Sequence, residues 1–252
     1  MAYITRSEDH HYTIHANGSA GLLPFDGVTY PGTTGILKVM DKSDALMAWA
    51  ARMTAEAAVT MGGQLVPLIE TVGPQGAIKA LTERSGWYKD QAAALGSEVH
   101  DLADQLVRGV NVGPWPAHVE KRVIAYAEWW QASGWTLRAS EALLVNPRLG
   151  YGGTLDLLAR DRDGLTVLAD IKTGGRIYRE VFLQLAAYGD ASWLEYAGGL
   201  FPMPRVDRYA VLHVTDKGVR EVPIAVGDLE RKAFAACIEV YRWREATRGM
   251  KL

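Results

Sequence analysis

The sequence predicts a protein of the α/β or α+β class, in which a β-sheet is flanked by helices. Two observations predict this class. Residues 41–133 are dominated by helix-forming segments that glycine and proline separate, whereas residues 134–225 contain several runs of strand-like composition. A last helical segment covers residues 226–248, and the first 40 residues lack a sustained helical period. We therefore expect an irregular arm or short hairpin at 1–40 and a single domain at 41–252.

Each predicted element follows from local composition and turn residues. Helices are expected where alanine, leucine and methionine are dense, and they end at glycine or proline. Strands are expected where β-branched and apolar residues run between turn signals such as Asp161-Arg162-Asp163-Gly164. The helices are predicted at 45–59, 74–84, 89–108, 116–132, 178–196 and 228–247, and the strands at 135–145, 152–159, 165–172, 207–215 and 219–224.

Composition excludes several classes of protein. A single cysteine, Cys237, leaves no pair for an internal disulfide and no ligand set for an iron–sulfur cluster or a cysteine-bound zinc ion. No apolar run reaches the roughly 18 residues of a membrane-spanning helix, and no secretion signal is seen at the N-terminus. We therefore expect a cytoplasmic protein without a membrane partner. The formal net charge of −2 means that a nucleic acid would need a local basic surface or a bound metal ion.

Two acidic residues and a lysine lie on neighbouring predicted strands. Because side chains alternate across a strand, Leu155 and Leu157 are expected on one face and Asp156 on the other. The same rule places Asp170 and Lys172 together on one face of the next strand. Two strands can thus present two carboxylates and an ammonium group to one place.

This arrangement suits a hard divalent cation. Mg²⁺ prefers carboxylate oxygens, and phosphodiester hydrolysis uses such a cation to neutralise developing negative charge. Asp156 and Asp170 would supply the carboxylates, and the backbone carbonyl of Ile171 would add a neutral oxygen. Lys172 would orient or deprotonate the attacking water, or stabilise charge on the phosphate. By itself, an Asp-x-Lys triplet more often marks a solvated strand face.

Two helical pairs lie on either side of these strands. In Gly96-Ser97-Glu98-Val99-His100, the glycine and the histidine are four residues apart and share a helix face. Gln184 and Tyr188 have the same spacing on the helix that follows the Asp-x-Lys strand. Taken singly, a helical histidine is more often structural than a ligand. Glu141, on the strand before Asp156, is equally compatible with a solvated carboxylate and with a role beside a metal.

Taken in order, Gly-x-x-x-His, Glu141, Gly-Gly-Thr-x-Asp, Asp-x-Lys and Gln-x-x-x-Tyr resemble the PD-(D/E)XK nuclease superfamily, specifically its RecB-like branch with phage exonucleases. The resemblance covers about Gly96 to Tyr188 and implies a central mixed sheet flanked by helices, with an N-terminal helical region. The metal ligands that it implies are His100, Asp156 and Asp170, to which the strand geometry adds the carbonyl of Ile171, and the catalytic residues are Asp156, Asp170 and Lys172.

The resemblance implies a DNA nuclease that depends on Mg²⁺ or Mn²⁺. Some members of the family hold an iron–sulfur cluster with four cysteines, and with one cysteine this chain departs from them, so no cluster is expected. We expect an exonuclease of phage or bacterial DNA recombination and repair, which would act in the host cytoplasm if phage-encoded. Its partners would be DNA and a single-strand annealing or recombination protein. Supporting or DNA-binding roles are expected for Glu141, Arg176, Arg179, Gln184 and Tyr188.

Three alternatives compete with this hypothesis. The first is a module of the nuclease fold that binds nucleic acid or protein without cutting. The second is a sequence-specific endonuclease built on the same core. The third is a hydrolase that uses paired carboxylates as acid and base. Lys172 disfavours this third alternative, because we expect its charge to keep Asp170 ionised and unable to donate a proton.

Overall fold

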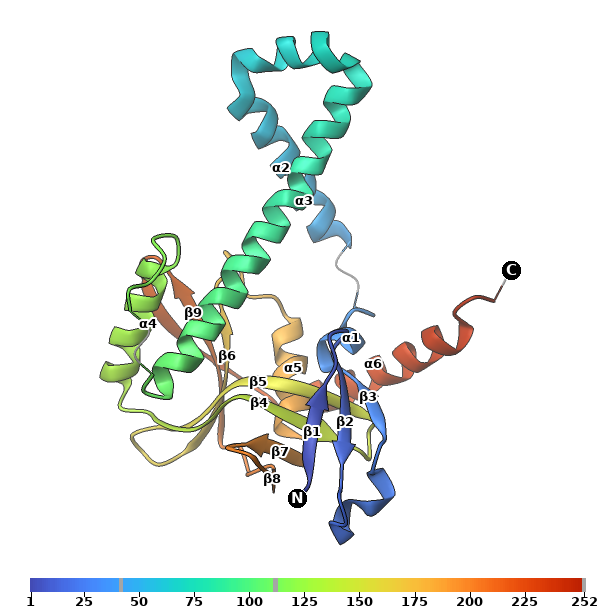
Figure 1. Ribbon diagram of the computed structural model, residues 1–252, viewed down its shortest axis with the longest axis vertical. Coiled ribbons are helices and arrows are strands. Elements are labelled where there is room, and N and C mark those ends of the chain that lie inside the picture. Colours follow the sequence, from blue (N-terminus) through green and yellow to red (C-terminus); the bar gives the residue numbers. More distant parts are fainter. Residues whose placement is uncertain (41–42, 111–112, 251–252) are drawn as a thin grey trace. The chain divides into compact units, whose positions relative to one another are not determined.

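The computed structural model describes residues 1–40, 43–110 and 113–250. The chain divides into two compact units (Figure 1). The sheet unit comprises Met1–Met40 and Val99–Leu252, and the helical unit comprises Asp41–Glu98. This division differs from the expected one, because the first 40 residues pack with the sheet and the helical segment after them forms its own unit. The expected start of the main domain, at residue 41, lies outside the described residues.

A seven-stranded sheet forms the centre of the sheet unit, in the order β10-β9-β6-β5-β4-β7-β8. Neighbouring strands are antiparallel except β6 and β9, which are parallel. The expected α/β class, with a large mixed sheet flanked by helices, is therefore confirmed. The strands are β4 (Thr136–Asn146), β5 (Tyr151–Arg160), β6 (Thr166–Lys172), β7 (Trp193–Tyr196), β8 (Gly199–Pro202), β9 (Arg208–Thr215) and β10 (Gly218–Ile224).

The turn between β5 and β6 is held by one carboxylate. Asp161 accepts the backbone N–H groups of Asp163 and Leu165, each at 3.0 Å, and its other oxygen lies 2.5 Å from Nη1 of Arg208. Burial raises the pKa of Asp161, but these donors outweigh it, and the pKa lies below its ordinary value. The hairpin predicted at Asp161–Gly164 is confirmed, and the carboxylate also ties it to β9.

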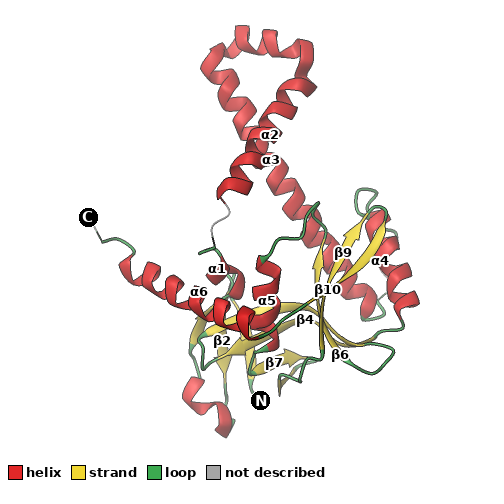
Figure 2. Ribbon diagram, turned by 180° about the vertical axis from the view of Figure 1, so that it is seen from behind, coloured by secondary structure: helices red, strands yellow, loops and turns green. Residues whose placement is uncertain are grey.

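Helices cover the sheet on both sides. α1 (Thr33–Leu37), α5 (Glu180–Gly189) and α6 (Asp228–Thr247) pack on the face that Figure 2 shows in front. α4 (Glu120–Ser133) packs against β9 and β10, and the last turns of α3 (Leu65–Val107) cross the face that Figure 1 shows. The apolar core between the sheet and helices α1, α5 and α6 includes Ile36, Leu155, Leu168, Leu185 and Phe234.

The first 40 residues form a second, three-stranded sheet. It consists of β1 (Tyr3–Arg6), β2 (His11–His15) and β3 (Thr29–Pro31), all antiparallel. Ile4, Tyr12 and Ile14 pack from it against Val145 of β4. The expectation of an irregular arm is wrong here, whereas the alternative, a short hairpin, is present as β1 and β2, and β3 extends it to a sheet. Strands of three to five residues are too short to show a clear period in sequence, and their apolar partner lies more than 100 positions away.

Three predicted helices have different bounds in the structure. The segment predicted as one helix at 178–196 ends as α5 at Gly189 and continues as β7, which pairs with β4. The helices predicted at 74–84 and 89–108 are one element, α3, which is irregular only at Gly73 with φ of 74°. Tertiary pairing decides the first difference, since local composition alone favours helix there. The remaining elements are η1 (Ala20–Phe25), α2 (Ser43–Met61) and η2 (Gly62–Gln64).

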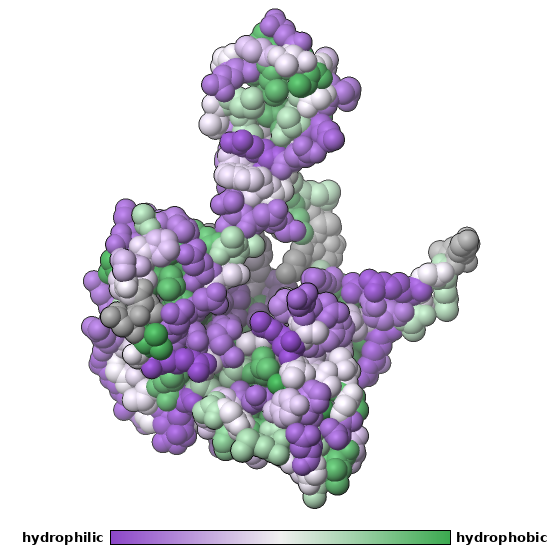
Figure 3. All heavy atoms as spheres, in the orientation of Figure 1, coloured by the Kyte–Doolittle hydropathy of each residue, from purple (hydrophilic) through white to green (hydrophobic). Residues whose placement is uncertain are grey.

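No helix in the described part of the chain has both the length and the apolar character needed to cross a membrane. Hydrophilic residues cover much of the face of the sheet unit that Figure 3 shows.

Two glycines of β5 allow close approach of aromatic rings from opposite directions. A Cβ at Gly152 would lie 2.5 Å from the Cβ of Tyr12, on the small sheet. A Cβ at Gly153 would lie 2.5 Å from Cε1 of Tyr188, on α5. Both distances are far below a van der Waals contact, so only glycine fits. The Gly-Gly step of the Gly-Gly-Thr-x-Asp segment is therefore a packing requirement of the strand that contains Asp156.

We expect Gly153→Ala to lower the free energy of unfolding by about 1–3 kcal/mol, because the added methyl group must displace the buried ring of Tyr188. Urea unfolding followed by circular dichroism measures this loss. Gly35→Ala is the matched control, since Gly35 is helical and a Cβ there has no atom within 4 Å. Equal midpoints for both variants would contradict the packing argument.

Candidate metal centre

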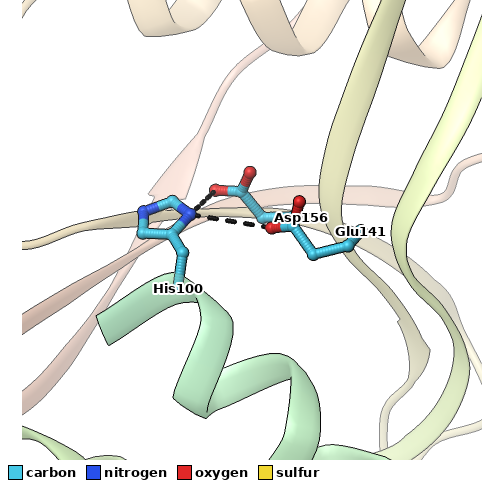
Figure 4. Close-up of side chains that lie close together, drawn as sticks. All are labelled: His100, Glu141 and Asp156. Carbon is cyan, nitrogen blue, oxygen red and sulfur yellow. Dashed lines mark ion pairs between the residues drawn. The ribbon is translucent and has the colours of Figure 1, made fainter. Parts of the chain in front are cut away.

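Three side chains from different elements converge on one point of the sheet unit (Figure 4). His100 comes from α3, Glu141 from β4 and Asp156 from β5. Nδ1 of His100 lies 3.6 Å from Oδ2 of Asp156 and 3.8 Å from Oε1 of Glu141. One ligand atom from each residue lies within 4.8 Å of the others. An imidazole nitrogen and two carboxylate oxygens thus face a common point, and these are ligand types that divalent metal ions use.

A hydrogen-bond network fixes the end of α3 against β4. Asp104, one helical turn after His100, accepts a hydrogen bond from Oγ of Ser140 at 2.5 Å and pairs with Nε of Arg108 at 2.6 Å. Arg108 also donates to the backbone carbonyl of Ser140 at 2.6 Å. Ser140 directly precedes Glu141. The network therefore holds the helix that supplies the imidazole beside the strand that supplies a carboxylate.

The backbone of Glu141 is irregular. Its φ is 45°, in the left-handed region that residues other than glycine rarely adopt. On the paired strand, Leu155 and Leu158 both pack in the large core although they are three residues apart. Side-chain alternation thus slips by one residue around Asp156, and the strict alternation expected for β5 is wrong. Backbone irregularity of this kind is concentrated at functional sites, where it redirects side chains.

The neighbouring strands β5 and β6 part at this place. Their paired register ends at Leu157 and Ala169. Beyond that pair, the backbone N–H of Ile171 donates to Oδ2 of Asp156 at 2.6 Å. A side-chain oxygen thus accepts the hydrogen bond that a backbone carbonyl of the partner strand accepts in a regular ladder. The N–H and C=O of one strand residue point to the same edge. The carbonyl of Ile171 therefore faces the space beside Asp156, as expected for a neutral oxygen ligand.

Asp170 is buried and forms an ion pair with the partly exposed Lys172, whose Nζ lies 2.6 Å from Oδ2 of Asp170. Apart from this ion pair, neither oxygen of Asp170 has a hydrogen-bond partner among the described residues. Burial raises the pKa of Asp170 to about 6, although the charge of Lys172 acts in the opposite direction. Desolvation thus outweighs the ion pair in the net direction of the pKa, but a pKa of about 6 still leaves most of this carboxyl ionised at neutral pH, as expected beside Lys172.

The charges around His100 favour its protonated form. Burial lowers the pKa of His100, but the carboxylates of Asp156 and Glu141 outweigh it and raise the pKa to about 9. Burial also lowers the pKa of Lys172, and Asp170 raises it above its ordinary value. Positive charge is thus strongly stabilised at this point of the sheet.

The residues present fit a divalent cation. The cluster has one imidazole and two carboxylates at short mutual distances, and a third, fully buried carboxylate lies on the adjacent strand with its hydrogen-bonding capacity unfilled. Asp170, expected as a direct ligand, lies outside the closest group and is held by Lys172 instead. Glu141, expected only in a supporting role, is inside the group. His100, Asp156 and Glu141 are therefore the residues that would hold the ion first.

The expected supporting pair on α5 is present. Nε2 of Gln184 donates to the hydroxyl of Tyr188 at 3.0 Å. Tyr188 is buried, and its ring lies against Gly153 of β5. Burial raises the pKa of Tyr188 well above its ordinary value, and the nearby charge of Asp156 acts in the same direction. The pair supports β5 from behind the site, and the buried hydroxyl stays protonated.

Arg176 and Arg179, expected to contact DNA, are exposed on the segment between β6 and α5. No ion pair joins either arginine to a carboxylate of the described residues. The segment is tied down by Nε2 of His213, which lies 2.6 Å from the carbonyl of Gly174. Both guanidinium groups are thus available to an anionic partner on the same segment of chain that leaves Lys172.

No motif in the sequence indicated that side chains of the small sheet contact β5 next to this site. Arg6 and Tyr12 both reach Thr154, two residues before Asp156 on β5. The alternating buried pattern of β2 was a signal for the strand, but no local pattern shows which part of the chain it packs against.

No protein-family model and no curated protein matches this chain. The class of protein is therefore defined by the fold and the site: a mixed α/β protein whose central sheet presents a candidate centre for a divalent metal ion.

We expect His100→Ala to weaken Mn²⁺ binding by about tenfold or more, because the variant loses the one imidazole of the group. Isothermal titration calorimetry measures the affinity. His15→Ala removes a histidine of the small sheet, which stacks on Tyr3 away from the group, and should leave the affinity unchanged. An unaltered Mn²⁺ affinity in His100→Ala would show that His100 is structural.

Proposed function

We propose that this protein is a DNA nuclease of the PD-(D/E)XK type, dependent on Mg²⁺ or Mn²⁺. One observation carries the proposal: His100, Glu141 and Asp156 gather where β5 and β6 part, next to the ion pair of Asp170 and Lys172. The residues that the resemblance names in sequence order are thus neighbours in space. A metal site without an adjacent lysine would not favour phosphodiester chemistry in this way.

A bound Mg²⁺ or Mn²⁺ supplies charge neutralisation and a more acidic water for phosphodiester hydrolysis. His100, Glu141 and Asp156 would hold it, with the carbonyl of Ile171 as a further oxygen. Asp170 fixes the ammonium group of Lys172 at 2.6 Å. The raised pKa of Lys172 keeps it protonated, so we assign it to donate hydrogen bonds to the attacking water or to the phosphate oxygens rather than to accept a proton.

The acid–base hydrolase is the weaker hypothesis. The imidazole of His100 lies within 4 Å of the carboxylates of both Asp156 and Glu141. Two carboxylates that act as acid and base do not need such an imidazole, whereas a metal ion binds all three groups. The raised pKa of Asp170 does not favour the hydrolase, since the carboxyl is enclosed and held by Lys172.

DNA is the substrate that we propose. The net charge of −2 leaves little general attraction for a polyanion, so local cations must hold it. Arg176 and Arg179 are exposed, and the Gly174-Gly175 step allows backbone N–H groups to approach a phosphate. Such contacts position a strand without selecting its sequence. This favours an exonuclease over a sequence-specific endonuclease, and we extend the proposal to phage or bacterial recombination and repair, with a single-strand annealing protein as partner.

We expect Asp170→Asn and Lys172→Ala each to lower the rate of DNA cleavage by a factor on the order of 10² or more, because each removes a charge beside the reacting phosphate. Cleavage of linear DNA with Mn²⁺, followed on gels, measures the rate. Lys217→Ala, which removes an exposed lysine from the β9–β10 turn, is the control and should cut normally. Folding of every variant is checked by circular dichroism. Near-normal cleavage by either site variant would remove the catalytic assignment.

A second prediction concerns the form of the DNA. Because phosphate contacts carry no sequence information, we expect selection by DNA ends. Linear duplex should be degraded progressively with Mg²⁺ or Mn²⁺ and protected by EDTA, while covalently closed circles survive under the same conditions. Agarose gels of matched linear and circular forms of one plasmid test this. Discrete fragments from closed circles would instead favour an endonuclease on the same core.

A further inference from the structure

We infer that the N-terminal sheet supplies a second phosphate-binding site, formed by Arg6, Tyr12 and Thr154. Its ligand would be a backbone phosphate of DNA next to the phosphate that is cut. The inference rests on the proposed function, and it assigns to β1 and β2 a part in substrate binding that the sequence motifs do not include.

Three polar side chains from three strands meet at this place. Nη1 of Arg6, on β1, donates to Oγ1 of Thr154 at 3.3 Å. The hydroxyl of Tyr12, on β2, lies 3.0 Å from the same oxygen. Thr154 and Asp156 are two residues apart on β5, which corresponds to about 7 Å along a strand. The polar group and the candidate metal centre are thus adjacent sites on one strand.

The charge at this place suits a phosphate. Arg6 is exposed, and no ion pair joins it to a carboxylate of the described residues. A guanidinium group has five N–H donors in a fork that matches phosphate oxygens, and the bond to Thr154 uses one of them. Burial raises the pKa of Tyr12, so its hydroxyl remains a donor. The bond between Tyr12 and Thr154 uses one of their two hydroxyl hydrogens, so the cation of Arg6 and one hydroxyl donor are left for an anion.

The surroundings explain why such a cation is needed. Glu141, Asp156 and Asp170 bring three carboxylates to one region of the sheet, and a DNA strand approaching them would be repelled. Lys172 and protonated His100 offset two of these charges. Arg6 is the side chain that adds positive charge from the small sheet, and its anchoring by Thr154 fixes that charge beside Asp156.

Binding without cleavage tests the inference. The affinity of a short blunt-ended duplex with hydroxyl ends is measured in EDTA by fluorescence anisotropy, over a series of KCl concentrations. We expect Arg6→Ala to weaken binding about tenfold and to make the slope of log affinity against log salt shallower by about 1, as loss of one phosphate contact does. Tyr12→Phe, which removes only a hydroxyl, should weaken binding with no change of slope.

The controls separate charge from structure. Arg160→Ala removes an exposed arginine from the far end of β5 and should leave both affinity and slope unchanged. Arg6→Lys keeps the charge, so it should keep the slope even if the hydrogen bond to Thr154 is lost. An unchanged slope in Arg6→Ala, or an equal change in Arg160→Ala, would overturn the inference. Thermal unfolding of each variant shows whether the sheet is intact, and Arg6→Lys tests the site if Arg6→Ala unfolds.

The two proposals fail in different ways. If wild-type protein cuts DNA with Mn²⁺ and Arg6→Ala binds normally, the nuclease proposal stands and the phosphate site is rejected. If Arg6→Ala loses binding but wild-type protein does not cut DNA with either metal, the phosphate site stands and the nuclease proposal is rejected.

Discussion

The separation of β5 from β6 beyond Leu157 and Ala169 is the constraint on which the site depends. Two paired strands would satisfy each other's backbone groups and leave no room between them. Here the carboxylate of Asp156 takes over one backbone N–H, that of Ile171, at 2.6 Å. The sheet can therefore open without leaving that buried donor unsatisfied, and carboxylates of both strands lie at the opening.

The neighbouring elements keep this opening in a fixed shape. Asp104, Ser140 and Arg108 hold the end of α3 on β4, so the imidazole of His100 stays beside the carboxylates. From the other side, Tyr188 packs where Gly153 has no side chain. A site that must hold a cation needs its ligands positioned in advance, because each ligand that has to be ordered on binding reduces the affinity. The strained backbone of Glu141 is consistent with such positioning.

The electrostatics of the site follow from burial. Three carboxylates in a small region repel one another, and burial makes their ionised forms still less favourable. The protein compensates with protonated His100 and with Lys172, whose pKa values are both raised. A divalent cation would satisfy the same carboxylates more fully and would take the place of the proton on His100. In the phosphate site that we infer, Arg6 would add one further positive charge to this region.

The sequence by itself determined the central strands, the turn at Asp161, the closing helix and the residue types that meet at the site, because each follows from local period, turn chemistry or short spacing. Only the tertiary structure decided the rest. Residues 193–196 form β7 because they pair with β4, and the small sheet is held in place because its apolar side chains pack against Val145. Likewise, Glu141 lies in the candidate metal group and Asp170 pairs with Lys172 because of strand irregularity and burial, which depend on contacts distant in sequence.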